Sequence, residues 1–145
     1  MLAADQLSKF VLVTRMAPGD SFPLLPPVLS LTYVQNTGAA FGLFRGWQAA
    51  FILLSGLVVG WMLWELARPD TTSRVTRWGC ALVLGGAVGN LIDRLRLGYV
   101  IDFLDLHVWP VFNIADSAIT IGVTLLVVHA VFTSRGQGAG GGGHG

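Results

Sequence analysis

Two long apolar runs constrain what this chain can fold into more than any other feature. One extends from Trp47 to Ala67 and is closed by Arg68, and the other extends from Ile114 to Phe132. A helix needs about 20 apolar residues to cross the roughly 30 Å hydrocarbon core of a bilayer. Each run therefore predicts a transmembrane helix.

Two shorter runs complete a predicted set of four transmembrane helices. Residues 78–92 are apolar up to Asn90, which precedes Asp93, and they predict a helix that ends in a protein-lined cavity. Residues 1–16 are interrupted by Asp5 and Lys9, and they lack the basic start and the cleavage site of a signal peptide. We expect a retained first helix whose amino-terminal part is missing, because only four residues precede Asp5.

Composition supports an all-α membrane protein. Of the 145 residues, 53% are hydrophobic and 12% are charged, whereas about 25% are charged in an ordinary soluble domain. The net charge of +1 and the scattered Lys and Arg residues give no reason to expect a nucleic-acid partner. The single cysteine, Cys80, excludes an internal disulfide, and without neighbouring Cys or His residues it predicts no structural zinc site.

The basic residues between the predicted spans are nearly balanced on the two sides of the membrane. If Arg94 is held inside a site it does not count as a loop charge, and one side then carries the narrow excess that marks the cytoplasm. Both termini are therefore expected inside and the two long loops outside. The inner group is Arg68, Arg74, Arg77 and Arg135, and the outer group is Arg15, Arg45, Arg94 and Arg96.

The two outer loops differ from simple connections. Residues 29–44 alternate in the manner of a β-strand after a proline-rich entry, which predicts a small sheet on the membrane surface. Residues 98–112 are apolar enough to rest at the interface, with Tyr99 and Trp109 as anchors. The glycine-rich residues 136–145 are expected to be disordered, so the folded domain covers residues 1–135.

Asp102 and Asp116 stand in otherwise apolar sequence beside the last predicted span. Acids at membrane depth are costly and usually functional. Two carboxyl groups in a dry site share one proton, so the ionised group can draw a proton from water while the neutral one polarises a carbonyl. Asn113 and Asp116 have the spacing of a helix N-cap and an acid at N3, which favours an ionised Asp116. Asp102, in an extended stretch, is then expected to hold the proton.

Each acid also has a purely structural interpretation. Asp116 can merely complete a capping box, and Asp102 can be a solvated loop acid. Asp105 and His107 follow Asp102 closely, and we interpret them as ordinary surface residues rather than as groups at the rim of a site.

Two pairs of polar residues are spaced four apart, on one face of a helix. Arg94 carries a fork of donors that can hold a carboxylate or a substrate carbonyl, and the amide of Asn90 can fix an orientation. Alternatively, Arg94 pairs with Asp93 at the end of a helix. The second pair, Asp5 and Lys9, is most simply an intrahelical ion pair.

Small residues mark the faces on which the second and third spans are expected to pack closely. These faces are also where a lateral opening toward the bilayer is expected. The residues are Gly56 and Gly60 in the second span, and Gly85, Gly86 and Gly89 in the third.

Five short blocks, spread over nearly the whole chain, resemble in their order the motifs of one enzyme family. They are Asp5-Gln6-Leu7-Ser8-Lys9, Asn36-Thr37-Gly38-Ala39-Ala40-Phe41-Gly42, Gly89-Asn90-Leu91-Ile92-Asp93-Arg94, Val100-Ile101-Asp102-Phe103 and Phe112-Asn113-Ile114-Ala115-Asp116-Ser117. The family that they resemble is the bacterial lipoprotein signal peptidase, signal peptidase II. No single block is specific, but five in register are hard to obtain by chance.

The resemblance implies an intramembrane aspartic endopeptidase with four transmembrane helices, a small periplasmic β-cradle and a short outer helix. It implies that Asp102 and Asp116 form the catalytic pair. Substrate binding is then assigned to Asn36, Gly38, Asn90, Arg94 and Asn113, and a supporting role to Asp5, Lys9 and Asp93.

The implied substrate is a prolipoprotein whose cysteine already bears a diacylglyceryl group, and the cut falls just before that cysteine. The implied location is the bacterial cytoplasmic (inner) membrane, with the active site toward the periplasmic face. Neither a metal nor an organic cofactor is expected, because hydrolysis needs only the two acids and water. Membrane lipid and globomycin-type peptide inhibitors are the other expected partners, and the enzyme is expected to be a monomer.

Two other classes stay open on the residues alone. An ion-coupled transporter also places acids and an arginine at membrane depth, and it would show pH-driven flux. A structural membrane subunit would tolerate Asp102→Asn and Asp116→Asn without loss of function.

Overall fold

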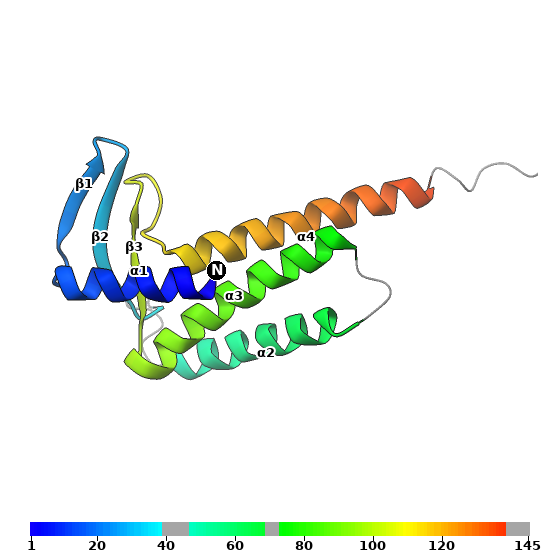
Figure 1. Cartoon of the computed structure of the whole chain (residues 1–145), viewed down its shortest axis with the longest axis horizontal. Coiled ribbons are helices and arrows are strands. Elements are labelled where there is room, and N and C mark those ends of the chain that lie inside the picture. Colours follow the sequence, from blue (N-terminus) through cyan, green and yellow to red (C-terminus); the bar gives the residue numbers. More distant parts are fainter. Residues whose placement is uncertain (39–46, 69–72, 139–145) are drawn as a thin grey trace, which may run out of the picture.

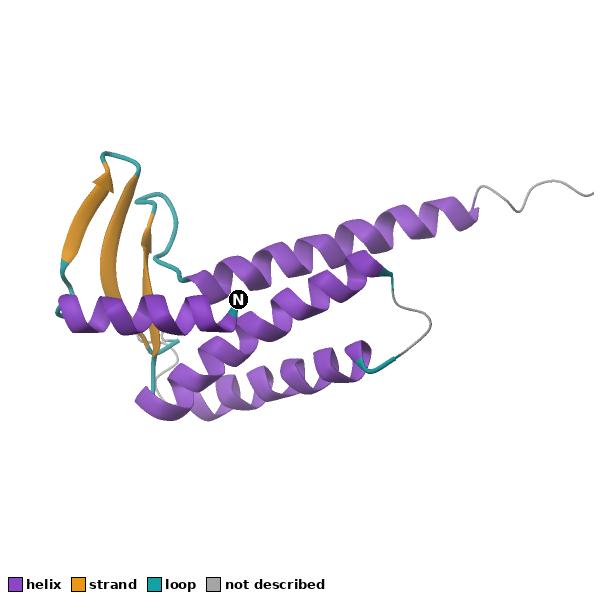
Figure 2. Cartoon of the chain, viewed as in Figure 1, coloured by secondary structure: helices purple, strands orange, loops and turns teal. Residues whose placement is uncertain are grey.

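Three long helices lie side by side and carry a small antiparallel sheet at one end (Figures 1 and 2). The computed structural model describes residues 1–38, 47–68 and 73–138, and residues 134–138 without their side chains. The elements are α1 (Leu2–Arg15), β1 (Ser21–Leu25), β2 (Leu29–Asn36), α2 (Gln48–Leu66), α3 (Arg74–Leu97), β3 (Val100–Asp105) and α4 (Ile114–Gly138).

Three helices of the described residues are long and apolar enough to cross a membrane, namely Gln48–Leu66, Arg74–Leu97 and Ile114–Thr133. The first helix is present as α1, but its 14 residues extend only about 21 Å, less than a hydrocarbon core of roughly 30 Å. The structure supports a polytopic membrane protein with three candidate spans among its described residues, and α1 packs against α3, α4 and β3 at the sheet end (Figure 1).

The third span is longer than the predicted residues 78–92, since α3 runs from Arg74 to Leu97. The prediction was wrong at the polar end because it treated Asn90 and Asp93 as a stop. Both side chains are buried among hydrogen-bonding partners, so they cost the helix little and it continues to Gly98, whose φ of 84° ends it.

The sheet has the order β1-β2-β3 and is antiparallel throughout. The predicted sheet over residues 29–44 is confirmed for β2, but β1 lies in the proline-rich entry and β3 comes from beyond α3. Pairing of Val34 with Asp102 and of Ser30 with Asp105 joins segments far apart in the chain, which local alternation does not reveal. No short outer helix occurs in the described segments, and residues 39–46 lie outside them.

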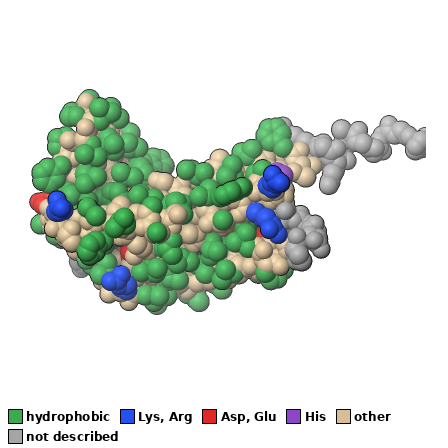
Figure 3. Space-filling model, viewed as in Figure 1, with side chains coloured by type: hydrophobic (Ala, Val, Ile, Leu, Met, Phe, Trp, Pro, Cys, Tyr) green, Lys and Arg blue, Asp and Glu red, His purple; other side chains and the backbone are tan. Residues whose placement is uncertain are grey.

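A small core holds the sheet on the first helix. Leu12 of α1 and Met16, the residue that follows this helix, pack against Tyr33 of β2 and against Ile101 and Phe103 of β3. Elsewhere the long helices expose their apolar side chains, and Figure 3 shows hydrophobic atoms over most of the visible face. A surface of this kind is stable in lipid and not in water.

Glycines set the distance between α3 and α4. A Cβ atom on Gly86 would overlap the carbonyl oxygen of Ala115, and one on Gly122 would lie 2.7 Å from the carbonyl oxygen of Gly79. The predicted close approach is thus confirmed for Gly86. A close approach is also present at Gly89, where an added Cβ atom would lie 2.6 Å from the Asp5 carboxylate. The atoms nearest to a Cβ atom added on Gly85 belong to Met1 and Leu2.

The same prediction is wrong for α2. An added Cβ atom on Gly56 or Gly60 would meet nothing within 4 Å among the described residues. The spacing of small residues alone does not say whether a helix or lipid faces them.

The last helix continues past the predicted end at Phe132 to Gly138. The first three residues of the tail predicted to be disordered are therefore helical. The remainder, residues 139–145, lies outside the described residues.

Gly86→Ala is expected to destabilise the protein by about 1–3 kcal/mol, because the added methyl group pushes on the backbone of α4. Gly56→Ala is the matched control, since its methyl group enters open space and alanine favours the helix. Thermal unfolding of the detergent-solubilised protein measures both. Equal midpoints for the two variants would contradict the packing described here.

Candidate functional site

A buried network of polar side chains lies where the sheet meets the helices. A buried polar group is stable only when hydrogen bonds replace the water that it loses. Six members are at most 6% exposed, and they are Asp5, Lys9, Asn90, Asp93, Asp102 and Asn113.

Asn113 connects the two acids singled out from the sequence. Its Nδ2 donates to Oδ1 of Asp102 at 2.7 Å, and its backbone N–H donates to Oδ2 of Asp116 at 3.2 Å. Its Oδ1 accepts from the backbone N–H of Asp116 at 2.9 Å, which completes the predicted capping box at the start of α4. The capping interpretation of Asp116 is therefore correct, but it uses only one of the two carboxylate oxygens.

The other oxygen of Asp116 faces α3. The Nδ2 of Asn90 donates to Oδ1 of Asp116 at 2.7 Å, and the Nδ2 of Asn113 donates to Oδ1 of Asn90 at 3.1 Å. Two amides thus link Asp102 and Asp116. Both acids, from β3 and from α4, belong to one hydrogen-bonded unit.

Asp102 is 2% exposed and receives two side-chain hydrogen bonds. One comes from Asn113, and the other comes from Nδ2 of Asn36 at 2.8 Å. Burial raises the pKa of Asp102 to about 6, and the nearby charge of Asp116 acts in the same direction. The hydrogen bonds from Asn36 and Asn113 and the charge of Lys9 oppose this rise in pKa without cancelling it.

Lys9 is buried between two acids and an amide. Its Nζ lies 2.9 Å from Oδ2 of Asp5, 2.7 Å from Oδ2 of Asp93 and 3.1 Å from Oδ1 of Asn90. The expected ion pair of Asp5 and Lys9 is present, but it is buried inside the protein, and Lys9 also pairs with Asp93. The alternative pairing of Asp93 with Arg94 is wrong, because Asp93 binds Lys9 instead.

Gln6 is a member of the network that the sequence analysis missed. Its Nε2 is within hydrogen-bonding distance of Oδ2 of Asp5, Oδ1 of Asp93 and the carbonyl oxygen of Gly89. The Oδ1 of Asp5 accepts the backbone N–H of Ala115, in the first turn of α4, at 3.0 Å. A Cβ atom on Gly89 would lie 2.6 Å from the Asp5 carboxylate, so these contacts require glycine there.

Arg94 is half-buried next to the two linked acids. Its guanidinium carbon lies 5.4 Å from the centre of the Phe51 ring of α2, and its charge acts on Asp116 and Asp102. Among the described residues, no carboxylate lies within 4 Å of its nitrogen atoms. Its donors therefore remain available to a further ligand.

Asn36 and Gly38 form the sheet-side wall of the site. While Nδ2 of Asn36 donates to Asp102, its Oδ1 accepts the backbone N–H of Gly38 at 2.8 Å. Gly38 has a φ of 77°, and a Cβ atom there would collide with the ring of Phe51. Only glycine fits this turn. The rest of that motif block, residues 39–42, lies outside the described residues.

Asp105 and His107 are separate from this network. The carboxylate of Asp105 accepts from the hydroxyl of Thr32 and from the backbone N–H of His107, and Nε2 of His107 lies 3.1 Å from Oγ of Ser30. Both residues make contacts within the sheet and the turn that follows it, which agrees with their interpretation as ordinary residues rather than rim groups.

A cavity of about 350 Å³ reaches one of the linked acids. Apart from Asp116 its walls are largely apolar, and they come from the segment after β3 and from α4. The lining residues are Leu106, Trp109, Phe112, Asp116, Ser117, Thr120 and Ile121. No cluster of His, Cys, Asp and Glu suited to a metal ion occurs in the part of the chain that the structure describes.

Long apolar helices beside a buried acidic network are the features of a membrane protein with a polar functional site. Residues 1–132 match the family model described as signal peptidase (SPase) II, and the chain belongs to that family. The family resemblance of the five sequence blocks is therefore confirmed.

Relatives and solved structures agree with this assignment. The chain is 46% identical to a lipoprotein signal peptidase of Moorella thermoacetica, covering 95% of this chain and 92% of the relative. It is 42% identical to that of Halothermothrix orenii, covering 89% and 88%. A bacterial membrane enzyme solved at 2.3 Å superposes with a TM-score of 0.84 at 32% identity, covering 92% of this chain and 84% of that one.

Asn36→Ala is expected to raise the pKa of Asp102 above about 6, by roughly one pH unit. The reason is that the Asn36 amide donates to the ionised carboxylate, and its loss disfavours that form. Infrared titration of the Asp102 carboxyl, identified by difference from Asp102→Asn, measures the change. Gln35→Ala is the control, because Gln35 hydrogen-bonds to Tyr33 and Tyr99 and not to Asp102. Coincident titration curves for the two alanine variants would refute this account.

Proposed function

We propose that this member of the signal peptidase II family is an aspartic endopeptidase in which Asp102 and Asp116 are the catalytic pair. The observation that carries the proposal is the bonding of both carboxylates to Asn113. One amide side chain and its own backbone N–H thereby hold the two acids together. The reaction of the family, removal of the signal peptide from prolipoproteins, can be carried out by such a pair and one water molecule.

The two acids have different environments, and this supports different roles. Asp116 receives N–H groups from Asn90 and Asn113 at the positive end of α4, which favours its ionised form. Asp102 is buried in the sheet, and its raised pKa favours the protonated form. Asp116 then draws a proton from the attacking water, and Asp102 protonates or polarises the scissile carbonyl.

The surrounding polar groups can hold the substrate backbone. Among the described residues no carboxylate pairs with Arg94, which leaves its donors free to bind substrate beside the acids, and Asn36 and Gly38 line the opposite wall. The apolar cavity that reaches Asp116 suits a substrate that stays in the bilayer, such as a diacylglyceryl-modified prolipoprotein cut before its lipidated cysteine. In this mechanism the acids and water suffice, without a metal or organic cofactor.

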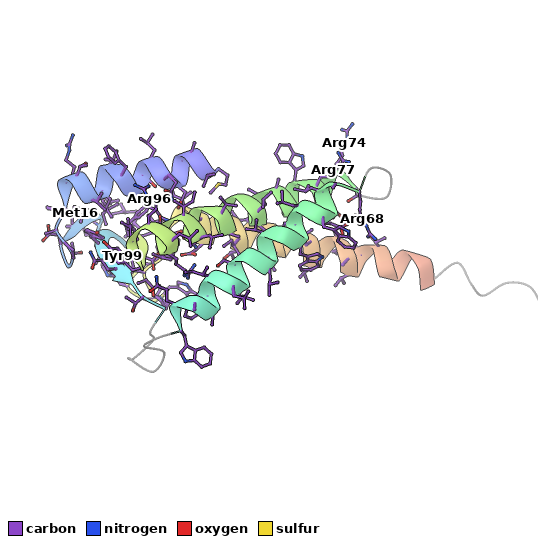
Figure 4. The ribbon with its side chains drawn as sticks, turned by 90° about the horizontal axis from the view of Figure 1, so that it is seen from below. Met16, Arg68, Arg74, Arg77, Arg96 and Tyr99 are labelled. Carbon is purple, nitrogen blue, oxygen red and sulfur yellow. The ribbon has the colours of Figure 1, made fainter. Side chains whose placement is uncertain are left out.

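We place this site at the outer face of the bacterial cytoplasmic membrane. Arg68, Arg74 and Arg77 gather at the end of the bundle away from the sheet (Figure 4). With Arg94 discounted as a site residue, the positive-inside rule assigns that end to the cytoplasm. The sheet and the two acids then face the periplasm. We further propose that a monomer surrounded by lipid is active and that globomycin-type peptides compete with substrate.

Asp102→Asn and Asp116→Asn are each expected to abolish cleavage, because each keeps the shape of the side chain but removes the ionisable acid. Purified protein with a diacylglyceryl-modified prolipoprotein measures turnover, and thermal unfolding checks that the variants are folded. Asp105→Asn is the matched control on the same strand, and it is expected to remain active. Turnover by a folded Asp102→Asn or Asp116→Asn variant would exclude the aspartic mechanism.

The pH dependence follows from the raised pKa of Asp102. If the protonated form of Asp102 is required, kcat/KM falls as the pH rises through about 6, because the free enzyme then loses that proton. A pH profile of kcat/KM tests this, and an alkaline limb that stays flat up to about pH 9 would contradict it.

A further inference from the structure

Lys9 makes one contact that a simple ion pair does not need. The side chain is buried, and either Asp5 or Asp93 alone would neutralise its charge. The third contact, 3.1 Å from Nζ to Oδ1 of Asn90, joins the ammonium group to the unit that holds the proposed catalytic acids.

This contact decides which end of the Asn90 amide faces Asp116. An ammonium group can only donate, so it can lie against the oxygen of the amide but not against its nitrogen. Asn113 donates to the same oxygen. The Nδ2 of Asn90 is consequently directed at Oδ1 of Asp116, 2.7 Å away. A reversed amide would place its oxygen against the carboxylate and its N–H groups against the ammonium.

We propose that Lys9 is a positioning residue of the peptidase reaction, which orients the Asn90 amide so that Asp116 is held by a donor and kept ready to accept a proton from water. The inference rests on the catalytic roles proposed above. Lys9 touches neither acid of the pair, and it acts on Asp116 through Asn90. It therefore deepens the supporting role expected from the sequence.

The charge of Lys9 has a second, measurable effect. It lowers the pKa of Asp102 and so opposes the effect of burial. Removing the charge is expected to raise that pKa above about 6. The charged and titratable groups near Lys9 are Asp5 of α1, Asp93 and Arg96 of α3, Asp102 of β3, Tyr33 of β2, and Tyr99. Those that act on Asp102 besides Lys9 are Asp116 of α4 and Arg94 of α3.

The test compares Lys9→Met with its parent in an Asp5→Asn background. The double variant loses one positive and one negative charge, so its buried cluster keeps the net charge of the wild type. The carboxamide introduced by Asp5→Asn can still accept the N–H of Ala115. Relative to Asp5→Asn alone, kcat is expected to fall roughly tenfold to a hundredfold, the size expected for a lost hydrogen bond to a charged group. KM should change little, and the alkaline limb of kcat/KM should move to higher pH.

Lys9→Gln in the wild-type background separates orientation from charge. Glutamine is neutral but can still donate to Oδ1 of Asn90, so most of kcat should be retained while the alkaline limb still moves to higher pH. Because the buried acids keep a donor, this variant also decides the matter if Lys9→Met does not fold.

Unchanged kcat together with an unchanged pH profile, in a folded Lys9→Met variant, would overturn the inference. A kcat for a folded Lys9→Gln variant as low as that of Lys9→Met would overturn it as well, because glutamine keeps the donor to Asn90. Neither result touches the aspartic mechanism, which fails only if Asp102→Asn or Asp116→Asn remains active. The two failures are therefore distinguishable.

Discussion

The ammonium group of Lys9, held between the carboxylates of Asp5 and Asp93, is the contact on which the arrangement of the helices depends. A charge removed from water at membrane depth is stable only where opposite charges and hydrogen bonds replace the solvent. Here α1 supplies the cation and one acid, α3 supplies the other acid, and the first turn of α4 donates the N–H of Ala115 to Asp5. These bonds fix one spacing of the three helices. At that spacing the Asp5 carboxylate leaves no room for a side chain at Gly89.

This spacing of the helices gives Asp102 and Asp116 different surroundings, although both are aspartates. Asp116 lies in the first turn of a helix and accepts a backbone N–H as well as the amide of Asn90, whereas Asp102 lies in a buried strand and accepts from the amide side chains of Asn36 and Asn113. The protein keeps the two carboxyl groups close through Asn113 while it gives them different solvation. This difference in solvation, rather than any special chemistry of the side chains, is what we propose divides the tasks of base and acid between them.

The sequence was most informative where the signal is local. Apolar length predicted α2 and the start of α4, and the spacing of Asn113 and Asp116 predicted their mutual capping. It was least informative where two distant segments meet. Three features could not be predicted because each joins residues far apart in the sequence. They are the pairing of β3 with β2, the buried position of Asp93 opposite Lys9, and the contacts of Gln6. For the same reason the glycines of α2 looked like those of α3, although among the described residues only those of α3 lie close to another helix.

The distance in sequence between Lys9 and its partners has a consequence for biosynthesis. Asn90 lies 81 positions after Lys9, which at about 5–20 residues per second corresponds to roughly 4–16 s of translation. During that interval the emerging first helix carries its lysine and aspartate without the acid of α3, and the N–H groups of α4 do not yet exist. The buried contacts of the first helix are therefore completed only after α3 and the first turn of α4 have been synthesised.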